Sequence, residues 1–565
     1  SGYPRTVREW RRGTPLSAAV EVFRGERTDV SVRGYLSRHG SHVYEWRVRS
    51  PSFYSSKRQL RRVHEDGTVG GWLSLDDAVP DDCTLRQFRD QLLIRLRSEW
   101  RGFAPGTLLA ARVDELAWDL SGEPGGREPA AVGGRQATLT PLFEPSERVA
   151  LRGLTLTRTK AVCTLLDDVR TRVLSLSCSD DGAWACDEAD GREPVIGGLS
   201  ISAVDADEGD EVWLTSWSHL QPHALTISSV AEGVKGLDAS ARRLRALPAQ
   251  FDASKLEVFQ EFATSRDGTR IPFFVVRPTA AAAAANAAAA ASATQTGSSA
   301  ARPPPPVPTL LYGYGGFEIS LTPNYMSTVG AAWLERGGCF VEANIRGGGE
   351  FGPAWHQSAL REKRGRAYED FEAVAARLVE LGVTTREQLA CRGGSNGGLL
   401  VGNMLVRSPE QWGAVVCAVP LLDMRRYNKL LAGASWMAEY GDPDTSDWAD
   451  FLSAYSPYHN IDPSQQYPPM LMTTSTRDDR VHPYHARAMV ARLEEAGCCD
   501  GLLYYENIEG GHGGAADPKQ QAFMICLYVQ FLMQTIGAGY RSFADARLAD
   551  AAGRGGGGAT APAGG

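Results

Sequence analysis

A serine held between glycines constrains this chain more than any other feature. Residues 393–398 read Gly-Gly-Ser-Asn-Gly-Gly, with Ser395 at the centre of a Gly-x-Ser-x-Gly pattern. Glycines on both sides let neighbouring backbones approach closely and let the serine adopt a strained conformation. The apolar stretch at residues 399–406 then predicts a helix leading away from the turn. The pattern also fits an ordinary glycine-rich turn, so the rest of the chain has to decide.

Strands and helices alternate through the second half of the chain. Such alternation predicts a doubly wound, mainly parallel sheet with helices on both faces, and the serine turn makes it an α/β-hydrolase sheet. An Asp-Gly hairpin at residues 256–276 marks its start, so we assign this domain to residues 256–543. Strands are predicted at Thr309–Tyr312, Cys339–Ala343, Ala414–Val419, Met470–Thr474 and Leu502–Tyr505, and helices at Tyr368–Leu381, Tyr484–Ala496 and Lys519–Thr535.

Two stretches of the second half have low complexity. Residues 279–308 are nearly all alanine, then serine and threonine, then a run of prolines. They predict an inserted surface segment without chemistry, in which the proline run favours an extended spacer. Residues 544–565 are rich in glycine and alanine, and we expect a disordered tail there.

The first 255 residues are mostly β in character. Many short strands at regular spacing predict a sandwich, a barrel or a propeller, and no repeat signature decides among them. At about four strands per blade, a propeller of this length would have roughly four blades. The segments are Val30–Tyr35, His42–Val48, Gln91–Leu96, Thr107–Val113, Val149–Thr155, Val173–Ser177 and Glu211–Ser216.

Length, charge and cysteine content limit the possible domain organisation, partners and compartment of the protein. A chain of 565 residues is too long for one compact core, so two large domains are expected. The net charge of −8 argues against a nucleic-acid-binding surface, and no apolar run is long enough to span a bilayer. The ten cysteines contain no Cys-x-x-Cys pair, which favours free thiols in a reducing compartment, the cytoplasm. The chain starts at Ser1 without a methionine or signal-peptide pattern, so we expect a removed start or a fragment.

Three polar residues of the second half are placed to form a catalytic triad. A serine nucleophile needs a base within hydrogen-bond reach and a carboxylate that orients the base. In α/β-hydrolases the acid and then the histidine follow the serine along the chain. Asp478 comes just after the predicted strand at residues 470–474, and His512 lies between glycines after the last predicted strand. We therefore predict Ser395, Asp478 and His512 as nucleophile, acid and base.

Neighbouring residues compete for two of these roles. Asp479 is adjacent to Asp478 and equally ionisable. His482 and His485 are alternatives to His512 by composition, but they lie beside a predicted helix start, where surface roles are expected. Their His-x-x-His spacing is weakly metal-like, without a cysteine or carboxylate partner pattern, so we predict no metal site and no cofactor.

The tetrahedral intermediate of acyl transfer needs donors aimed at its oxyanion. The backbone N–H of Asn396, directly after the nucleophile, is one by the geometry of the turn. The second donor should come from the end of an early strand, where residues 311–317 read Leu-Tyr-Gly-Tyr-Gly-Gly-Phe. Both the backbone N–H groups of these glycines and the hydroxyl of Tyr314 qualify.

Eight short motifs lie between about residues 263 and 532 and in combination resemble one family, the prolyl oligopeptidases. They are YGYGGF at 312–317, TPNY at 322–325, ANIRGGGEFG at 343–352, GGSNGG at 393–398, DM at 423–424, ASWMAEYGDP at 434–443, DDRV at 478–481 and GGHG at 510–513. The β-rich first part looks like the end portion of that family's propeller. The resemblance therefore implies an α/β-hydrolase domain preceded by a partial, all-β propeller at residues 1–255.

The resemblance also assigns site residues. It implies the triad above, with Asp478 rather than Asp479, and an oxyanion hole made by the Tyr314 hydroxyl and the Asn396 N–H. It further implies that Trp436 stacks on a substrate proline ring, that Phe317, Tyr440 and Val481 wall the same pocket, and that Arg480 hydrogen-bonds the carbonyl before the proline. Proline is flat, apolar and lacks an N–H, so aromatic stacking suits it. Core packing is the alternative role for Trp436 and Tyr440.

The resemblance implies a serine-type endopeptidase that cleaves short peptides on the carboxyl side of proline. We expect it to act as a monomer without nucleic-acid or membrane partners. One alternative is a different specificity within the same family: for basic residues as in oligopeptidase B, for acylaminoacyl peptides, or for esters. We find no clear acidic pair for the basic case. Another alternative is a non-catalytic propeller protein with a vestigial hydrolase. Compared with the family, the N-terminal segment and propeller look shortened and the alanine/proline insertion is unusual.

Overall fold

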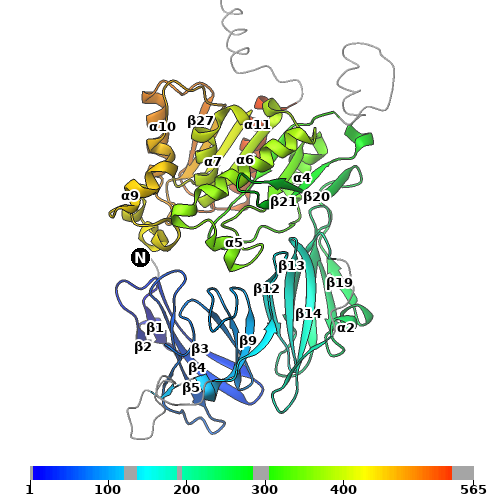
Figure 1. Cartoon of the computed structure of the whole chain (residues 1–565), viewed down its shortest axis with the longest axis vertical. Coiled ribbons are helices and arrows are strands. Elements are labelled where there is room, and N and C mark those ends of the chain that lie inside the picture. Colours follow the sequence, from blue (N-terminus) through cyan, green and yellow to red (C-terminus); the bar gives the residue numbers. More distant parts are fainter. Residues whose placement is uncertain (1–3, 117, 120–136, 188–193, 284–304, 538–565) are drawn as a thin grey trace, which may run out of the picture.

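The computed structural model describes residues 4–116, 118–119, 137–187, 194–283 and 305–537. A β-rich N-terminal part and an α/β C-terminal part lie one against the other (Figure 1). The predicted insertion at residues 279–308 falls mainly outside the described residues, and the predicted tail at 544–565 falls entirely outside them.

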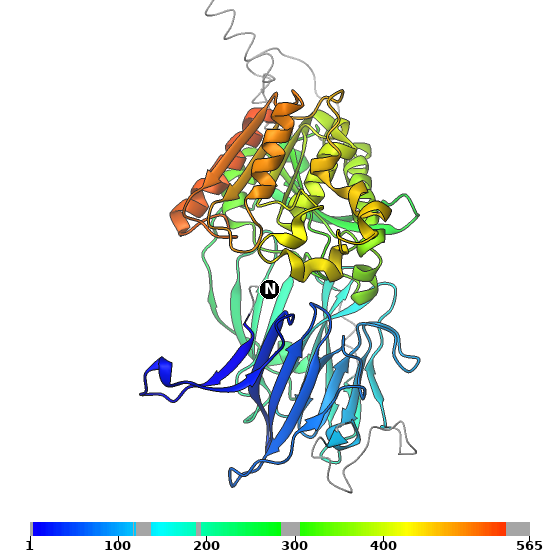
Figure 2. The same ribbon diagram turned by 90° about the vertical axis from the view of Figure 1, so that its left-hand side faces the viewer.

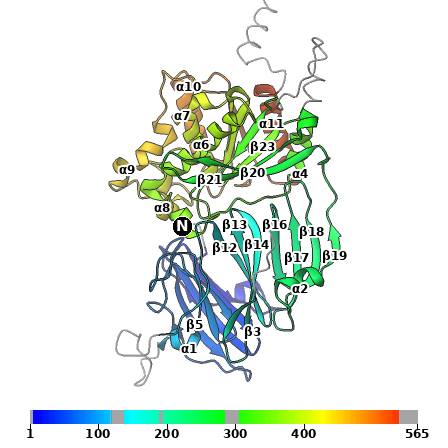
Figure 3. The same ribbon diagram turned by 45° about the vertical axis from the view of Figure 1, so that its right-hand side comes forward.

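Four antiparallel sheets of short strands make up the N-terminal part, in agreement with the expectation of roughly four blades (Figure 3). Their strand orders are β10-β6-β5-β4-β3, β11-β9-β8-β7, β12-β13-β14-β15 and β16-β17-β18-β19. A two-stranded ribbon, β1 (Thr6–Glu9) and β2 (Val20–Arg24), projects from the first sheet (Figure 2). The first two sheets contain β3 (Ser31–His39), β4 (His42–Ser50), β5 (Lys57–Val63), β6 (Leu73–Ser74), β7 (Thr84–Phe88), β8 (Gln91–Arg95), β9 (Leu108–Arg112), β10 (Trp118–Asp119) and β11 (Thr140–Phe143). The other two contain β12 (Val149–Leu156), β13 (Lys160–Asp167), β14 (Arg170–Cys178), β15 (Trp184–Asp187), β16 (Gly198–Ala203), β17 (Glu211–Trp217), β18 (Ala224–Ser229) and β19 (Arg242–Ala246).

The two middle sheets bury both faces against their neighbours, and the first and last sheets each share one core. Side chains of a strand alternate between the two faces of its sheet. In β8, Leu92 and Ile94 pack into the core shared with the first sheet, and Leu93 between them packs into the core shared with the third. This alternation explains why β8 reads as a continuous apolar run. The short helices α1 (Val113–Leu116) and α2 (Val234–Ala239) lie outside these sheets.

An eight-stranded mixed sheet forms the C-terminal part, in the order β20-β21-β23-β22-β24-β25-β26-β27. The first pairs are antiparallel and the pairs from β23 onwards are parallel. The strands are β20 (Leu256–Thr264), β21 (Arg270–Pro278), β22 (Thr309–Tyr312), β23 (Cys339–Ala343), β24 (Leu389–Gly394), β25 (Ala414–Ala418), β26 (Met470–Ser475) and β27 (Leu502–Asn507). The predicted boundary after residue 255 falls between β19 and β20 and remains a proposal.

Helices cover both faces of this sheet, as the alternation predicted. One core takes apolar residues from α6 (Gly365–Glu380), α7 (Asn396–Arg407) and α10 (Tyr484–Glu495). The other takes them from the end of α4 (Ser327–Ala332) and from α11 (Pro518–Thr535). The short helices α5 (Pro353–Gln357), α8 (Met437–Tyr440) and α9 (Asp447–Asp450) lie in loops beyond the strand ends. Within the described residues, none of the helices combines the length and apolar character needed to cross a bilayer.

Buried titratable groups line the contact between the two parts. His219, in the loop after β17, is fully buried, with its Nε2 atom 3.9 Å from Glu342 Oε1 at the end of β23. Burial lowers the pKa of His219 to about 4 and raises the pKa of Glu342 to about 7. Burial likewise raises the pKa of Glu350 to about 8. The charge of Arg152 on β12 acts on both carboxyl groups. Burial at this interface therefore favours the protonated forms of Glu342 and Glu350.

We expect Glu350→Gln to unfold several degrees higher than wild type at pH 9 and at a similar temperature at pH 5. The folded-state pKa of Glu350 lies above the value of about 4.3 for an unfolded chain, so its stabilising contribution is full below that value and is lost as the pH rises through about 8. Glutamine keeps an acceptor for the Leu321 N–H, now 2.7 Å from Glu350 Oε1, and cannot ionise. Thermal unfolding of both proteins at the two pH values measures the effect, and a difference independent of pH would contradict it.

Candidate active site

Ser395 occupies a strained turn between β24 and α7. Its φ of 58° and ψ of −118° lie in a region that side chains rarely adopt, and its N–H donates to Ala418 O over 3.0 Å. The flanking glycines are required by space, because a Cβ on Gly393 would lie 2.0 Å from the carbonyl oxygen of Gly397. Strain held in this way is characteristic of functional positions, and here it lifts one hydroxyl above the carboxyl ends of the parallel strands.

Asp478 and His512 form a hydrogen-bonded pair beyond the ends of β26 and β27. His512 Nδ1 lies 2.7 Å from Asp478 Oδ2. The other oxygen, Oδ1, accepts the backbone N–H groups of Arg480 and Val481, each over 2.9 Å. The carboxylate, 4% exposed, is thus fixed by the turn and uses its second oxygen to orient the imidazole. A proton on Nδ1 leaves His512 Nε2 as a basic lone pair.

The structure separates the competing residues. Asp479 is exposed, whereas Asp478 is buried, so the predicted preference for Asp478 agrees with the fold. The surface role expected for His485 is wrong: this residue is 1% exposed and its Nδ1 accepts the N–H of Asp423 over 3.1 Å. His482 instead accepts the N–H of Tyr484 at the start of α10. Across the described residues, no group of three or more His, Cys, Asp or Glu is arranged to hold a metal ion.

Tyr314, in the loop after β22, lies against the nucleophile. Its phenol lies close enough to the Ser395 side chain for that hydroxyl to act on its pKa. Burial raises the pKa of Tyr314 to about 12, and the Ser395 hydroxyl opposes the rise only in part. The phenol therefore keeps its proton and remains a donor. Within the described chain no hydrogen bond joins Ser395 to His512, so the structure brings the acid and base together and leaves the serine hydroxyl outside that pair.

A pocket of about 330 Å³ opens beside Ser395. Eight of the ten residues predicted for the site line this pocket. Asp478 and His512 are not among the lining residues. The lining residues are Phe53, Tyr314, Phe317, Ile319, Ser395, Asn396, Leu421, Trp436, Tyr440, Arg480 and Val481. The rings of Phe317 and Tyr440 meet edge to face with centroids 5.7 Å apart. Trp436 and Tyr440, 6% and 1% exposed, also belong to the core around α7, so the core-packing role weighed for them applies.

Phe53 was missed by sequence reasoning. It lies between β4 and β5 of the N-terminal part, and its ring packs edge-on against Phe317 with centroids 5.9 Å apart. The only signal was a pair of adjacent aromatic residues, Phe53 and Tyr54, in an otherwise serine-rich loop. One wall of the pocket therefore comes from the other domain.

A buried polar network behind the pocket was also missed. Glu439, 1% exposed, accepts Arg364 Nη1 over 2.9 Å and the Phe317 N–H over 3.0 Å on one oxygen. Its other oxygen accepts the Tyr54 hydroxyl over 2.5 Å and lies 2.8 Å from His356 Nε2. Burial alone would raise the pKa of Glu439, but the His356 hydrogen bond and the Arg364 charge outweigh it and lower the pKa to about 2.

The network ends at the residue after the nucleophile. Arg364 donates to Asn396 Oδ1, and the Tyr440 hydroxyl donates to the same oxygen over 2.8 Å. Asn396 Nδ2 in turn donates to Tyr314 O over 2.6 Å. Both predicted oxyanion donors, the Asn396 N–H and the Tyr314 hydroxyl, are therefore braced by one set of buried hydrogen bonds.

The comparison with known proteins agrees with this geometry. The model of the prolyl oligopeptidase family matches residues 324–538. Over 541 residues the chain is 36% identical to an uncharacterized peptidase, y4nA, of Sinorhizobium fredii, covering 95% of this chain and 68% of that protein. The chain belongs to the prolyl oligopeptidase family. A prolyl endopeptidase of Elizabethkingia miricola is 36% identical to this family member over 263 residues, 46% of this chain and 34% of that one.

A solved structure shares the whole architecture of this prolyl oligopeptidase family member. A post-proline cleaving enzyme from Rickettsia typhi superposes with a TM-score of 0.74 at 28% identity, covering 94% of this chain and 72% of that chain. The predicted fold, a propeller joined to an α/β-hydrolase domain, is thereby confirmed, and the chain is a serine peptidase. The interpretation as a non-catalytic propeller protein is set aside.

Proposed function

We propose that this peptidase hydrolyses short peptides on the carboxyl side of proline, with Ser395 as nucleophile, His512 as base and Asp478 as the acid that orients it. The observation that carries the proposal is the aromatic pocket beside Ser395. It is lined by Trp436, Phe317 and Tyr440, and its volume of about 330 Å³ has room for a proline ring. The Rickettsia typhi enzyme described as post-proline cleaving shares this architecture, which supports the same specificity.

The proposed reaction proceeds through an acyl-enzyme. Ser395 Oγ attacks the carbonyl carbon of the proline residue while His512 Nε2 takes the hydroxyl proton. The Tyr314 hydroxyl and the Asn396 N–H donate to the oxyanion that forms. His512 then gives its proton to the departing amine. Water deprotonated by the same nitrogen releases the peptide acid, and Asp478 holds the imidazole in one tautomer throughout.

This mechanism requires His512 and Ser395 to come into contact. Catalytic hydrogen bonds are often long in unliganded enzymes and tighten when substrate binds. Here the Ser395 hydroxyl lies near the Tyr314 phenol, and a substrate oxygen that accepts the Tyr314 hydroxyl leaves the serine able to turn towards His512. The glycines on both sides of His512 permit the small loop movement this needs.

The charges around the pocket favour proline over a basic residue. Among the described lining residues there is one arginine, Arg480, and no aspartate or glutamate. Glu439 lies behind the pocket wall, and both its oxygens are used by Arg364, Tyr54 and their neighbours. An arginine side chain of a substrate would therefore enter without a counter-ion, whereas a proline ring needs none. In this proposal Arg480, an exposed lining residue, donates to the substrate carbonyl that precedes the proline.

Hydrolysis of matched substrates tests the specificity. We expect a short amide with proline before the scissile bond to be cleaved with a kcat/KM at least about a hundredfold above its arginine and alanine counterparts, the scale of discrimination a shaped pocket provides. Equal rates on arginine substrates would point to the basic specificity, and activity confined to simple esters would point to an esterase.

Trp436→Ala should lower kcat/KM for the proline amide by about 30-fold, corresponding to the loss of about 2 kcal/mol of ring contact. The same change should lower hydrolysis of a small acetyl ester far less, because that substrate does not fill the pocket. Trp448→Ala is the matched control, since Trp448 lies in α9 and packs on His459 outside the pocket. An unchanged ratio of proline to ester activity in Trp436→Ala would remove the stacking role.

We also propose that the enzyme acts in the cytoplasm as a monomer, with peptide as its partner. All ten cysteines lie within the described residues and are unpaired, and six of them are buried, which supports a reducing compartment. Sedimentation of the purified chain measures the oligomeric state.

A further inference from the structure

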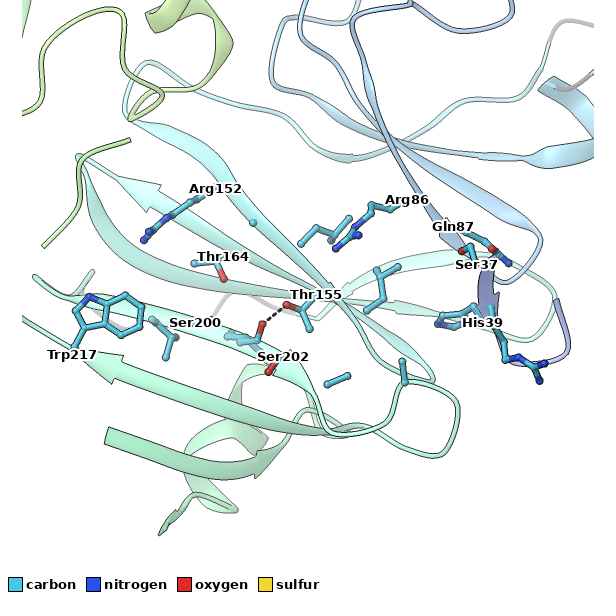
Figure 4. A pocket seen from close by; sticks show the side chains of 18 residues that line it. Ser37, His39, Arg86, Gln87, Arg152, Thr155, Thr164, Ser200, Ser202 and Trp217 are labelled. Atoms are coloured by element: carbon cyan, nitrogen blue, oxygen red, sulfur yellow. Dashed lines mark hydrogen bonds between the residues drawn. The ribbon is translucent and has the colours of Figure 1, made fainter. Parts of the chain in front are cut away.

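The propeller encloses a second cavity, of about 700 Å³ (Figure 4). Its walls come from the edge strands β3, β7, β12 and β16, one from each of the four sheets. Serine, threonine, leucine and arginine side chains make up most of its lining, whereas aromatic side chains dominate the pocket at Ser395.

The charged side chains among the described lining residues of this cavity are all positive. Arg38, Arg86 and Arg152 line it, and none of the described lining residues is an aspartate or glutamate. Within the described residues, none of the three arginines has an ion-pair partner, and none donates a side-chain hydrogen bond. By contrast, Arg49 and Arg346 elsewhere in the chain are each paired with carboxylates. Three unpaired cations around one cavity are unexpected in a chain whose net charge is −8.

Nearby carboxyl groups leave this positive charge largely uncompensated. Glu342 and Glu350 act on Arg152 from the catalytic domain, but burial raises their pKa values to about 7 and about 8, so both hold protons for much of the time near neutral pH. Asp207, next to the lining residue Ala206, accepts the Gly40 N–H over 2.8 Å and offsets part of the positive charge at that end. Arg152 Nη1 is buried without a hydrogen-bond partner within the described residues.

Neutral donors of the lining are also present. Gln87 Oε1 and His39 Nδ1, which are buried without a hydrogen-bond partner in the described part of the chain, are acceptors and take no part in binding a carboxylate, because His39 donates through Nε2 to Thr157 O. The hydroxyls of Ser37 and Ser202 lie on the same walls (Figure 4). Guanidinium groups with hydroxyl donors beside them form the arrangement that binds carboxylates, because each oxygen accepts more than one hydrogen bond.

The cavity borders the catalytic domain. Trp217 lines it and donates its Nε1–H to Pro323 O of the catalytic domain over 2.8 Å. Arg152 faces Glu342 and Glu350, which lie at and beyond the carboxyl end of β23. Ser395 follows the carboxyl end of β24 in the same sheet.

We propose that the propeller cavity binds carboxylate groups of the peptide substrate at positions remote from the bond that is cut, so that the enzyme prefers acidic peptides. This inference rests on the proposed peptide hydrolysis at Ser395 and adds a second determinant to it. The arginines hold the far end of the peptide while the aromatic pocket holds the proline. They touch no reacting atom and act on binding and capture.

Peptides that differ only in remote charge test the proposal. A fluorogenic core with one proline is extended by three glutamates, three glutamines or three lysines. For wild type at low salt we expect kcat/KM to be about tenfold higher for the glutamate peptide than for the glutamine peptide, with most of the gain lost in half-molar salt. Carboxylate and carboxamide forms of each C-terminus separate the side-chain carboxylates from the terminal one.

Arg38→Gln with Arg86→Gln should reduce the glutamate preference to about twofold or less and leave hydrolysis of the unextended core unchanged. Both side chains are exposed, so the double variant should fold. Arg243→Gln, on the outer strand β19 and outside the cavity, is the matched control and should keep the full preference. A wild type indifferent to remote charge overturns the proposal, and so does a preference that survives in the double variant.

Binding to an inactive protein separates this proposal from the proposed function. Fluorescence anisotropy of the labelled glutamate peptide with Ser395→Ala should give a Kd about tenfold below that of the glutamine peptide, and the cavity double variant in that background should abolish the difference. If no proline peptide is hydrolysed but this binding difference is found, the proposed proline specificity at Ser395 is contradicted and the proposed carboxylate site is supported. Equal binding of the two peptides removes the site whatever the hydrolysis shows. Inorganic phosphate is the competitor that tests for a phosphate site. If phosphate does not displace the glutamate peptide, a phosphate site is excluded.

Discussion

Ser395→Ala should lower kcat/KM for a proline amide by at least about 10⁴-fold while leaving the fold intact. Other serine peptidases that lose one triad member keep only the rate supplied by substrate binding and the oxyanion donors. The substitution removes one hydroxyl, and alanine meets the same backbone strain at a φ of 58° that serine does. Its thermal unfolding should therefore match wild type within about a degree or two, since a surface-type change is worth roughly half a kcal/mol.

Two measurements check this expectation. A fluorophosphonate probe should label wild type once and leave Ser395→Ala unlabelled. Asp479→Asn is the control for a nearby change, because its exposed side chain lies next to Asp478 without sharing its buried hydrogen bonds, and it should retain near-wild-type turnover. Turnover surviving in Ser395→Ala would remove the nucleophile assignment, and with it the role proposed for the strained turn.

Glu439→Gln should cost about 3 to 5 kcal/mol of stability and lower kcat/KM by about a hundredfold. Removing one partner of a buried ion pair leaves the other charge uncompensated, and Arg364 is 1% exposed. The freed guanidinium is hydrogen-bonded to Asn396, so its rearrangement would displace both oxyanion donors. The Phe317 N–H would also lose its carboxylate acceptor, which should loosen one wall of the pocket.

The pH dependence of stability identifies the charge as the cause. The folded-state pKa of Glu439 is lowered to about 2, below about 4.3 for an unfolded chain. Its contribution is therefore full above about pH 4.3 and is lost as the pH falls through about 2. The stability curves of wild type and Glu439→Gln should approach each other below pH 4. Glu380→Gln, which breaks an exposed pair on α6, should change stability by less than about 0.5 kcal/mol. Equal effects of the two substitutions would contradict the network.

Local features were predictable where local chemistry decides them. The turn at Ser395 follows from glycines that no other residue can replace in that space, and Asp478 and His512 follow from their places after two parallel strands. Seven strands of the propeller were predicted from short apolar segments between turns, although only their packing shows that both faces of β8 are buried.

Features made by distant contacts were not predictable. Glu439 lies between two residues that were assigned to the pocket, but nothing in the local sequence shows that it is buried against Arg364, which precedes it by 75 positions. His485 was expected at the surface because it follows a polar loop, and the packing of α10 against the Asp423 loop buries it. Phe53 entered the pocket through the docking of two domains, which no local pattern records.

Phe53 and Tyr54 give the propeller a direct share in chemistry that takes place on another domain. A catalytic half isolated from the propeller would lose the Phe53 wall of the pocket and the Tyr54 hydroxyl that donates to Glu439. Neighbouring positions in that serine-rich loop are also free to vary without disturbing the strained turn or the sheet beneath it. Substrate preference in such a molecule is therefore open to change by mutation far along the chain from the residues that cut the bond.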